Sequence, residues 1–275
     1  MKTSIYLRGL IGSIAMMLIL CNCTKDDYFL NSNSLLKKVK NNGYIIEEIS
    51  YNSNNLVSEV NGTSFWRKFY YNSNNKLIKQ EVAIDPSSLS SSMPASPSHD
   101  FVDPEKTGIS MYHIYEYDNN GLLTIQLNYI PKDGEDELRS INSFEYNDSN
   151  LISKELLHDG DNEVTQFRTY QYDANGNVIE EDYYTYLFIP VGTGPKHLSK
   201  TTFEYDSYLN PYKIFEQSGG PGLYTNLNNI LKTKTVNYDP APGLDAISIS
   251  ETSYEYNDKT GYPIRVIDGE EFIYE

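Results

Sequence analysis

One short pattern of residues recurs along the chain and constrains its fold more than any other feature. The pattern starts with four consecutive positions: an apolar or aromatic residue, any residue, a tyrosine, and Asp or Asn. A few turn residues and then a pair of apolar residues follow. The clearest copy occupies residues 170–179. Other copies begin at Ile49, Phe69, Tyr115, Phe144, Phe203, Val236 and Tyr254. This recurrence predicts a chain built from one kind of structural unit.

Each copy has the pattern of a β-hairpin. Residues alternate before the turn as in a half-buried strand, so Tyr170 and Tyr172 should point to one face and Gln171 to the other. One turn residue must adopt a positive φ angle, which Gly takes freely and Asn tolerates. That slot holds Asn54-Asn55, Asn74-Asn75, Asn120-Gly121, Ser149-Asn150, Asn175-Gly176 and Thr260-Gly261. The Asp or Asn after the tyrosine is expected to accept hydrogen bonds from backbone amides two residues further on.

Hairpins that follow one another predict an all-β fold. No stretch shows a sustained helical period of apolar residues, and one hairpin cannot bury its apolar face alone. We therefore expect a single antiparallel meander of hairpins, curled into an open-faced roll or a barrel-like sheet, with few or no helices. Pro211 and Pro263 are expected at the first positions of return strands, where a missing amide donor does little harm.

The N-terminus has the layout of a secretory signal. Lys2 and Arg8 accompany an apolar run at residues 10–20, which is shorter than the ~20 residues needed to span a bilayer. The two cysteines, Cys21 and Cys23, follow this run, and a disulfide between positions so close would be strained.

Residues 20–27 resemble a bacterial lipoprotein cleavage site. The resemblance implies cleavage before Cys23 and acylation of that cysteine with a fatty acid such as palmitate. The following Lys25-Asp26-Asp27 resembles the export tag of surface lipoproteins in the Bacteroidota. Together these resemblances imply a protein that is lipid-anchored in the outer membrane and exposed on the cell surface.

The chain therefore divides into three parts. Residues 1–22 are expected to be the signal peptide, residues 23–34 a lipid-anchored flexible tether, and residues 35–275 one repeat β domain. Within that domain, residues 85–108 contain four prolines and many serines. Such a stretch cannot pair in a sheet, so we expect it to form a mobile loop.

The acidic composition excludes one class of partner. The full chain has a formal net charge of −16, and loss of residues 1–22 removes Lys2 and Arg8, leaving 20 basic against 38 acidic residues, or −18. A surface of this charge repels phosphate backbones, so no nucleic-acid partner is expected.

We call each copy of the recurring pattern a phrase, and its tyrosine before Asp or Asn a phrase tyrosine. The phrases resemble the YD-type repeats of bacterial surface proteins and Rhs-type toxins. They are more similar to those of a group of Bacteroidota lipoproteins of unknown function. That group is described as having a porin-like, curled antiparallel sheet. Residues 210–213 and 254–263 carry this resemblance best. The group implies a fold, and it brings no catalytic residue to carry over.

The position before each phrase tyrosine indicates what the other face of the sheet meets. It holds four carboxylates, Glu116, Glu145, Glu204 and Glu255. A lipid-facing sheet needs an apolar band at such positions. We therefore expect this face to be hydrated and the domain to be tethered by lipid, not inserted.

The 25 tyrosines raise the question of a ligand platform. The phrase tyrosines recur at one strand position, as core residues do. The aromatic residues outside this phase, Trp66, Tyr70, Tyr183 and Tyr208, are candidates for an exposed platform that stacks on sugar rings.

The sequence contains no catalytic or metal-binding motif that we recognise. Its histidines form no metal-spaced pair, the acidic turns lack EF-hand spacing, and Gly-x-Ser-x-Gly, Walker and His-Glu-x-x-His motifs do not occur. We expect no cofactor, no metal and no enzyme activity, but a binding or structural module for a glycan or an envelope protein. The alternatives are a glycan hydrolase with two facing carboxylates, and an adhesin or scaffold.

Overall fold

The computed structural model describes residues 35–89, 100–187, 192–241, 243–257 and 259–275. The predicted signal peptide, the tether and the lipidated Cys23 lie outside the described residues, as does the middle of the predicted loop at residues 85–108. The described residues belong to one compact unit, and the description below concerns that unit.

The described part of the chain consists of β-strands with three short helical segments. The strands are β1 (Leu36–Asn41), β2 (Tyr44–Tyr51), β3 (Val57–Gly62), β4 (Phe65–Tyr71), β5 (Leu77–Ile84), β6 (Met111–Tyr117), β7 (Leu123–Ile130), β8 (Glu137–Tyr146), β9 (Ile152–Asp159), β10 (Val164–Tyr172), β11 (Val178–Thr185), β12 (Lys196–Leu209), β13 (Asn228–Asn237), β14 (Ile247–Glu251), β15 (Tyr254–Tyr256), β16 (Pro263–Val266) and β17 (Glu270–Tyr274). The helical segments are η1 (Pro86–Leu89), α1 (Pro104–Thr107) and η2 (Pro211–Ser218). No described helix is long and apolar enough to cross a bilayer.

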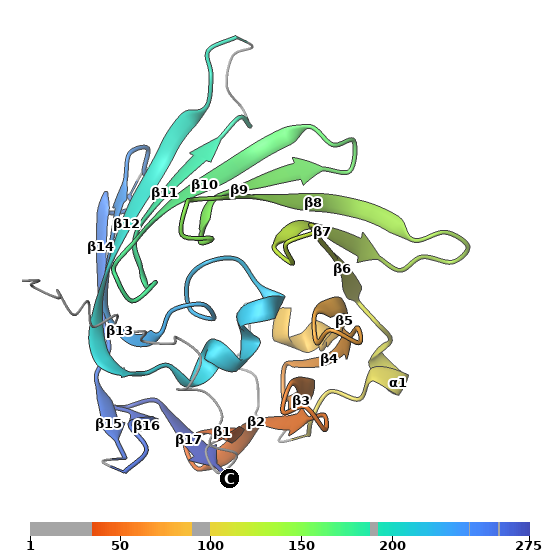
Figure 1. The fold of residues 1–275 in the computed structure, drawn as a ribbon, viewed down its shortest axis with the longest axis vertical. Helices are drawn as coiled ribbons and strands as arrows, with labels where there is room; N and C mark the ends of the chain where they lie inside the picture. The colour runs from red at the N-terminus through yellow and green to blue at the C-terminus, as the bar shows by residue number, and fades with distance from the viewer. Residues whose placement is uncertain (1–34, 90–99, 188–191, 242, 258) are drawn as a thin grey trace, which may run out of the picture. The chain divides into compact units, whose positions relative to one another are not determined.

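The described strands form one antiparallel sheet with the connectivity of a meander. Each strand from β1 to β14 pairs with its neighbours in sequence. β15 then pairs with β16, β16 with β17, and β17 returns to pair with β1. β14 and β15 follow each other along the chain with two residues between them, and the curled sheet does not close into a barrel (Figure 1). The predicted all-β meander is confirmed, and the open roll is the form it takes.

The turn residues behave as the repeat predicts. The left-handed slot has φ of 59° at Asn55, 60° at Asn75 and 58° at Asn150, and glycine fills it in other hairpins. After Tyr172, the Asp173 carboxylate accepts from the amide of Asn175 at 2.8 Å and from that of Asn177 at 2.9 Å. The same pair of side-chain bonds forms at Asn52, Asn72, Asp118, Asn147 and Asp159. Local turn chemistry thus sets the hairpin register.

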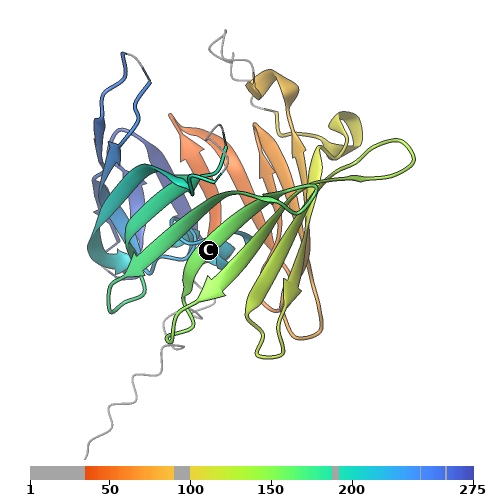
Figure 2. The same ribbon diagram turned by 90° about the horizontal axis from the view of Figure 1, so that it is seen from above.

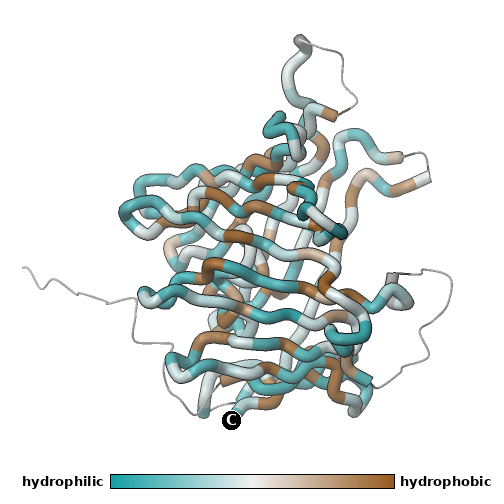
Figure 3. Tube along the Cα trace, turned by 90° about the vertical axis from the view of Figure 1, so that its right-hand side faces the viewer, coloured by the Kyte–Doolittle hydropathy of each residue, from teal (hydrophilic) through white to brown (hydrophobic). Residues whose placement is uncertain are grey.

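The two faces of the sheet differ as the alternation predicts, and Figure 3 shows the change of hydropathy along the strands. The inward phrase residues Phe69, Tyr115, Phe144 and Tyr170 are buried. Among the residues that precede the phrase tyrosines, Glu116, Glu145, Gln171 and Glu204 are exposed. Three of the four predicted carboxylates are therefore hydrated, while Glu255 is half-buried and pairs with Arg265.

The phrase that begins at Val236 departs from the pattern. Its Tyr238 is 51 % exposed and contacts His197 in a tilted arrangement with ring centroids 4.4 Å apart. The reason is that Tyr238 lies beyond the end of β13 and the next strand starts only at Ile247, so no tight hairpin closes over the ring. The prediction of a core tyrosine at this copy is therefore wrong.

The η2 turn lies inside the curl of the sheet (Figures 1 and 2). Its Phe215 is 2 % exposed and packs in the main core with Leu36, Val57 and Phe69. Pro211 begins this turn instead of a return strand, which corrects the prediction; Pro263 does begin β16. Asn210 caps η2, its side-chain oxygen accepting from the amide of Tyr212 at 2.9 Å. An Asn-Pro pair suits a helix start as well as a strand start, so the local sequence did not separate them.

Candidate functional site

A ladder of tyrosine hydroxyls runs along one rim of the concave face. The Tyr172 hydroxyl donates to the carbonyl oxygen of Ile152 at 2.6 Å, and that of Tyr146 to Leu123 at 2.7 Å. The same bond joins Tyr51 to Leu36, Tyr71 to Val57, Tyr117 to Leu77, Tyr205 to Val178 and Tyr274 to Pro263. Each acceptor is the first residue of the strand before the tyrosine's own strand.

Burial keeps these hydroxyls in their neutral form. Desolvation raises the pKa of Tyr117 and that of Tyr146 to about 12, and it raises the pKa of Tyr172 as well. The ladder tyrosines therefore donate hydrogen bonds at physiological pH and present uncharged rings.

An open groove of about 370 Å³ lies between this ladder and η2. We name it the η2 groove. One wall holds Tyr117, Tyr146 and Tyr172 with residues from the turns and the strand starts beside them, namely Lys76, Gly121, Leu122, Leu123, Asn150, Leu151, Ile152 and Gly176. The other wall holds Lys213, Glu216, Gln217, Gly219, Pro221 and Thr225. A groove of this volume, with aromatic rings and a few polar groups, has the character of a small-molecule site.

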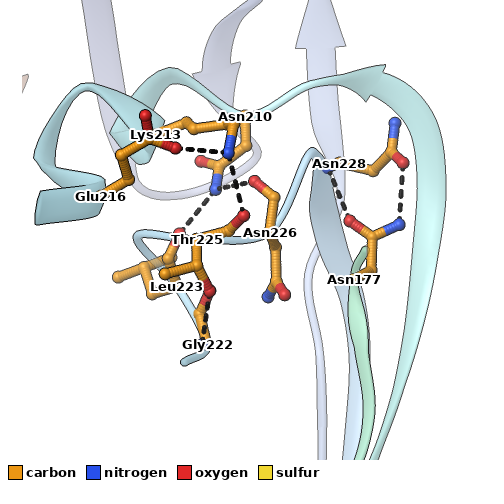
Figure 4. A network of polar contacts seen from close by, with 9 residues as sticks. All are labelled: Asn177, Asn210, Lys213, Glu216, Gly222, Leu223, Thr225, Asn226 and Asn228. Atoms are coloured by element: carbon orange, nitrogen blue, oxygen red, sulfur yellow. Dashed lines mark hydrogen bonds and ion pairs between the residues drawn. The ribbon is translucent and has the colours of Figure 1, made fainter. Parts of the chain in front are cut away.

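The η2 wall is held in place by side-chain amides (Figure 4). The Asn210 amide nitrogen donates to the carbonyl oxygens of Leu223 at 2.6 Å and Asn226 at 3.1 Å. The amides of Asn177 and Asn228 bond to each other at 2.9 Å and thereby tie the start of β13 to the turn before β11. The groove is thus largely formed before any ligand enters, which lowers the entropic cost of binding.

Gln217 fastens the other end of η2 to the sheet. Its side-chain oxygen accepts from the amide of Leu77 at 2.9 Å, and its nitrogen donates to the carbonyl of Asn75 at 3.2 Å. One glutamine therefore satisfies two backbone groups of a hairpin about 140 residues away in sequence.

The predicted aromatic platform is not assembled. Trp66 is 7 % exposed, packs with Ala83 and Val102, and donates to the Glu59 carboxylate at 3.0 Å. It is covered because the chain returns after the predicted loop and the Val102 amide bonds to the carbonyl of Gly62 at 3.0 Å. The expectation that Trp66 is exposed is therefore wrong.

The other three candidates lie apart from one another. Tyr70 on β4 donates to Glu81 at 2.6 Å, and Tyr183 on β11 contacts the Arg168 guanidinium at 4.6 Å. Tyr208, near the end of β12, is 41 % exposed and stacks on Tyr256. None of them lines the η2 groove. The tyrosines that do line it are phrase tyrosines, because the same alternation that marks a core position also marks a groove wall.

Two carboxylates, Glu155 and Glu181, influence each other electrostatically on the concave face, and that of Glu155 lies beside Gly220 in the loop after η2. Glu155 accepts from Asn142 at 2.7 Å and from Tyr170 at 2.8 Å, and Glu181 contacts the Arg168 guanidinium at 3.4 Å. Burial is the largest cause of a raised pKa at Glu181, and the charge of Glu155 adds to it. Neither carboxylate lines the η2 groove.

No family model matches the chain, and no curated protein matches its sequence. Among solved structures, the chain is similar to a porin-like protein from Bacteroides vulgatus, with a TM-score of 0.39, 9 % identity, and coverage of 88 % of this chain and 99 % of that one. A porin-like protein from Bacteroides uniformis has a TM-score of 0.37 and 10 % identity over 87 % of this chain and 98 % of that one.

A Tc holotoxin pore of Photorhabdus luminescens is also similar, with a TM-score of 0.22 and 12 % identity. This match covers 84 % of the present chain and 13 % of the toxin chain. Porin-like Bacteroides proteins and a toxin are thus among the solved structures that the chain is similar to. Attachment of lipid stays a prediction.

Proposed function

We propose that this protein is a non-enzymatic binding module, lipid-anchored through Cys23 on the outer face of the outer membrane, and that the η2 groove receives a glycan. The observation that carries the proposal is the groove of about 370 Å³ with three tyrosine rings on one wall and polar side chains on the other. The anchor rests on the residues around Cys23.

A sugar suits both walls of the groove. Its hydroxyls bond to amides and charged groups such as Asn150, Gln217 and Glu216, while its apolar C–H faces pack on aromatic rings. The bonds from the Leu77 amide to Gln217 and from Asn210 to the Leu223 carbonyl keep the η2 wall in place without a ligand.

The test is a glycan array probed with the full chain in detergent and with two matched tryptophan variants. Leu122→Trp fills the groove from the hairpin before β7. Leu56→Trp makes the same change at the equivalent position before β3, which does not line the groove. Binding by wild type and Leu56→Trp but not by Leu122→Trp supports the proposal. An array without a positive spot, or one on which both variants bind equally, refutes it.

The lipid anchor is tested separately. Cells fed labelled palmitate should incorporate it into the wild-type chain and not into Cys23→Ala, while Cys21→Ala keeps the label. Protease added to intact cells should then digest the anchored protein. Label that persists in Cys23→Ala, or full protection from protease, contradicts the anchoring and the surface location respectively.

A second candidate function, glycan hydrolysis, rests on one observation. The pKa of Glu181 is raised by burial beside Glu155, as an acid–carboxylate pair requires. The release of reducing ends from bound glycans, lost in both Glu155→Gln and Glu181→Gln, would establish this activity. Unchanged glycans after long incubation would dismiss it.

A further inference from the structure

The charges that line the η2 groove are opposite in balance to those of the whole chain. The lining contains two lysines, Lys76 and Lys213, and one carboxylate, Glu216, so its formal charge is +1. The chain as a whole carries −16. A negatively charged ligand is repelled by most of such a surface, and the groove is a place where the local balance favours it.

The two lysines have different surroundings. Lys213 donates to Glu216 at 2.7 Å and to the carbonyl of Thr225 at 3.2 Å, so its charge is matched within the wall. In the part of the chain that the structure describes, no carboxylate lies within ion-pair distance of the Lys76 ammonium. The Lys76 ammonium lies over the ring of Tyr117, 5.6 Å from the ring centroid. An aromatic face attracts an ammonium, but it does not replace a carboxylate as a hydrogen-bond acceptor.

The backbone of Lys76 is fixed, and its side chain extends past the neighbouring hairpin. The Asn72 side-chain oxygen accepts from the Lys76 amide at 3.0 Å, which holds the residue at the end of its turn. The side chain passes Gly121 of the next hairpin, where a Cβ atom would make only an ordinary contact with the Lys76 Cε, at 3.5 Å. Gly121 has φ of 79°, so its place in the turn suits glycine.

We propose that the η2 groove selects acidic sugars and that Lys76 binds the carboxylate of a uronic acid residue. The proposal rests on the proposed glycan-binding function and names its ligand class. The Lys76 ammonium gains a charge-assisted hydrogen bond to the ligand, while Tyr146 and Tyr172 provide the uncharged surface for the sugar ring. The contact is partly screened by salt, so binding of an acidic sugar weakens as ionic strength rises.

The experiment compares acidic polysaccharides with their carboxyl-reduced forms. The full chain in detergent is titrated with polygalacturonate, alginate and hyaluronate, and with each polymer after its carboxylates have been reduced to alcohols. Lys76→Gln removes the charge and Lys76→Arg keeps it. Lys37→Gln is the matched control, because the Lys37 ammonium lies 4.8 Å from the ring of Tyr51 but does not line the groove.

The expected result is that at least one acidic polymer binds. Carboxyl reduction and Lys76→Gln should each weaken its binding about tenfold, as expected for loss of one charge-assisted bond. Lys76→Arg should retain most of the affinity, and Lys37→Gln all of it.

Three results would overturn the inference. Equal binding of acidic and reduced polymers, or an unchanged affinity in Lys76→Gln, removes the role of Lys76. Binding of neutral glycans alone, sensitive to Leu122→Trp, leaves the glycan-binding function standing and refutes only the acidic selectivity. If neither acidic nor neutral glycans bind, the proposed function itself falls and the inference with it.

Discussion

The hydroxyl of Tyr172 donates to the carbonyl oxygen of Ile152 at 2.6 Å, across two neighbouring hairpins. The pairing of β9 with β10 ends at Lys154 and Thr169, so Ile152 lies beyond the last residue of β9 that pairs with β10. The tyrosine supplies a donor to a backbone carbonyl at a point where β10 no longer pairs with β9. Since an unpaired and partly buried carbonyl is costly, the hydroxyl makes each repeat depend on the previous one.

Removing one such hydroxyl should destabilise the fold. Tyr172→Phe keeps the ring and leaves the Ile152 carbonyl without its donor, so we expect the free energy of unfolding to fall by about 1 kcal/mol. Urea unfolding followed by circular dichroism measures the change. Tyr186→Phe is the control, because Tyr186 is 42 % exposed and its hydroxyl is not part of the ladder. Equal losses in the two variants would contradict a specific role for the ladder bond.

The hairpins were predictable because their determinants are local. The positive φ of Asn55, the side-chain bonds of Asp173 and the alternation around Tyr170 all depend on residues within a few positions. The tyrosine ladder was not foreseen, although its signal is present. Each phrase places a tyrosine at the strand end and an apolar residue at the next strand start, so a donor meets a carbonyl in every repeat.

The groove and the cover of Trp66 depend on distant residues and were not predictable in this way. Alternation identifies which face a side chain occupies but not what lies opposite that face. The element opposite Tyr117 is η2, about 100 residues further along the chain, and the residue that covers Trp66 is Val102. Tyr238 shows the converse, since its phrase is intact but no strand follows closely enough to bury it.

Substituting an Asn that has a positive φ angle should distinguish the stability lost through backbone strain from the stability lost with the side chain. Asn55 has φ of 59°, a conformation that costs an ordinary L residue roughly 1–2 kcal/mol. Asn55→Ala should therefore lower the free energy of unfolding by about 1 kcal/mol, while Asn55→Gly should change it by only a few tenths. Ser53→Ala in the same turn is the control. Urea midpoints that fall equally for the Ala and Gly variants would show that strain is not the cause.

The buried tyrosines should make the protein less stable at alkaline pH. Burial raises the pKa of Tyr117 and Tyr146 to about 12 from the usual 10.0, so the unfolded chain loses these protons first. Between those two pH values the unfolded state binds fewer protons than the folded state, and the free energy of unfolding falls as pH rises. In a pH titration, tyrosinate absorbance from these buried residues should appear only well above pH 10 in the native protein, but near pH 10 in urea. Coincident titration curves would contradict the burial.

Fluorescence of the single tryptophan tests how Trp66 is covered. Because its ring is 7 % exposed and packed under Val102, native emission should be at short wavelength and iodide should quench it weakly. Val102→Ala opens the cover, so quenching should increase, and the loss of packing should lower the free energy of unfolding by roughly 1–2 kcal/mol. Val164→Ala on β10 makes the same change away from this cluster and should leave quenching unaltered. Iodide quenching that is as strong in the native protein as in urea would mean that Trp66 is exposed, as the sequence alone had predicted.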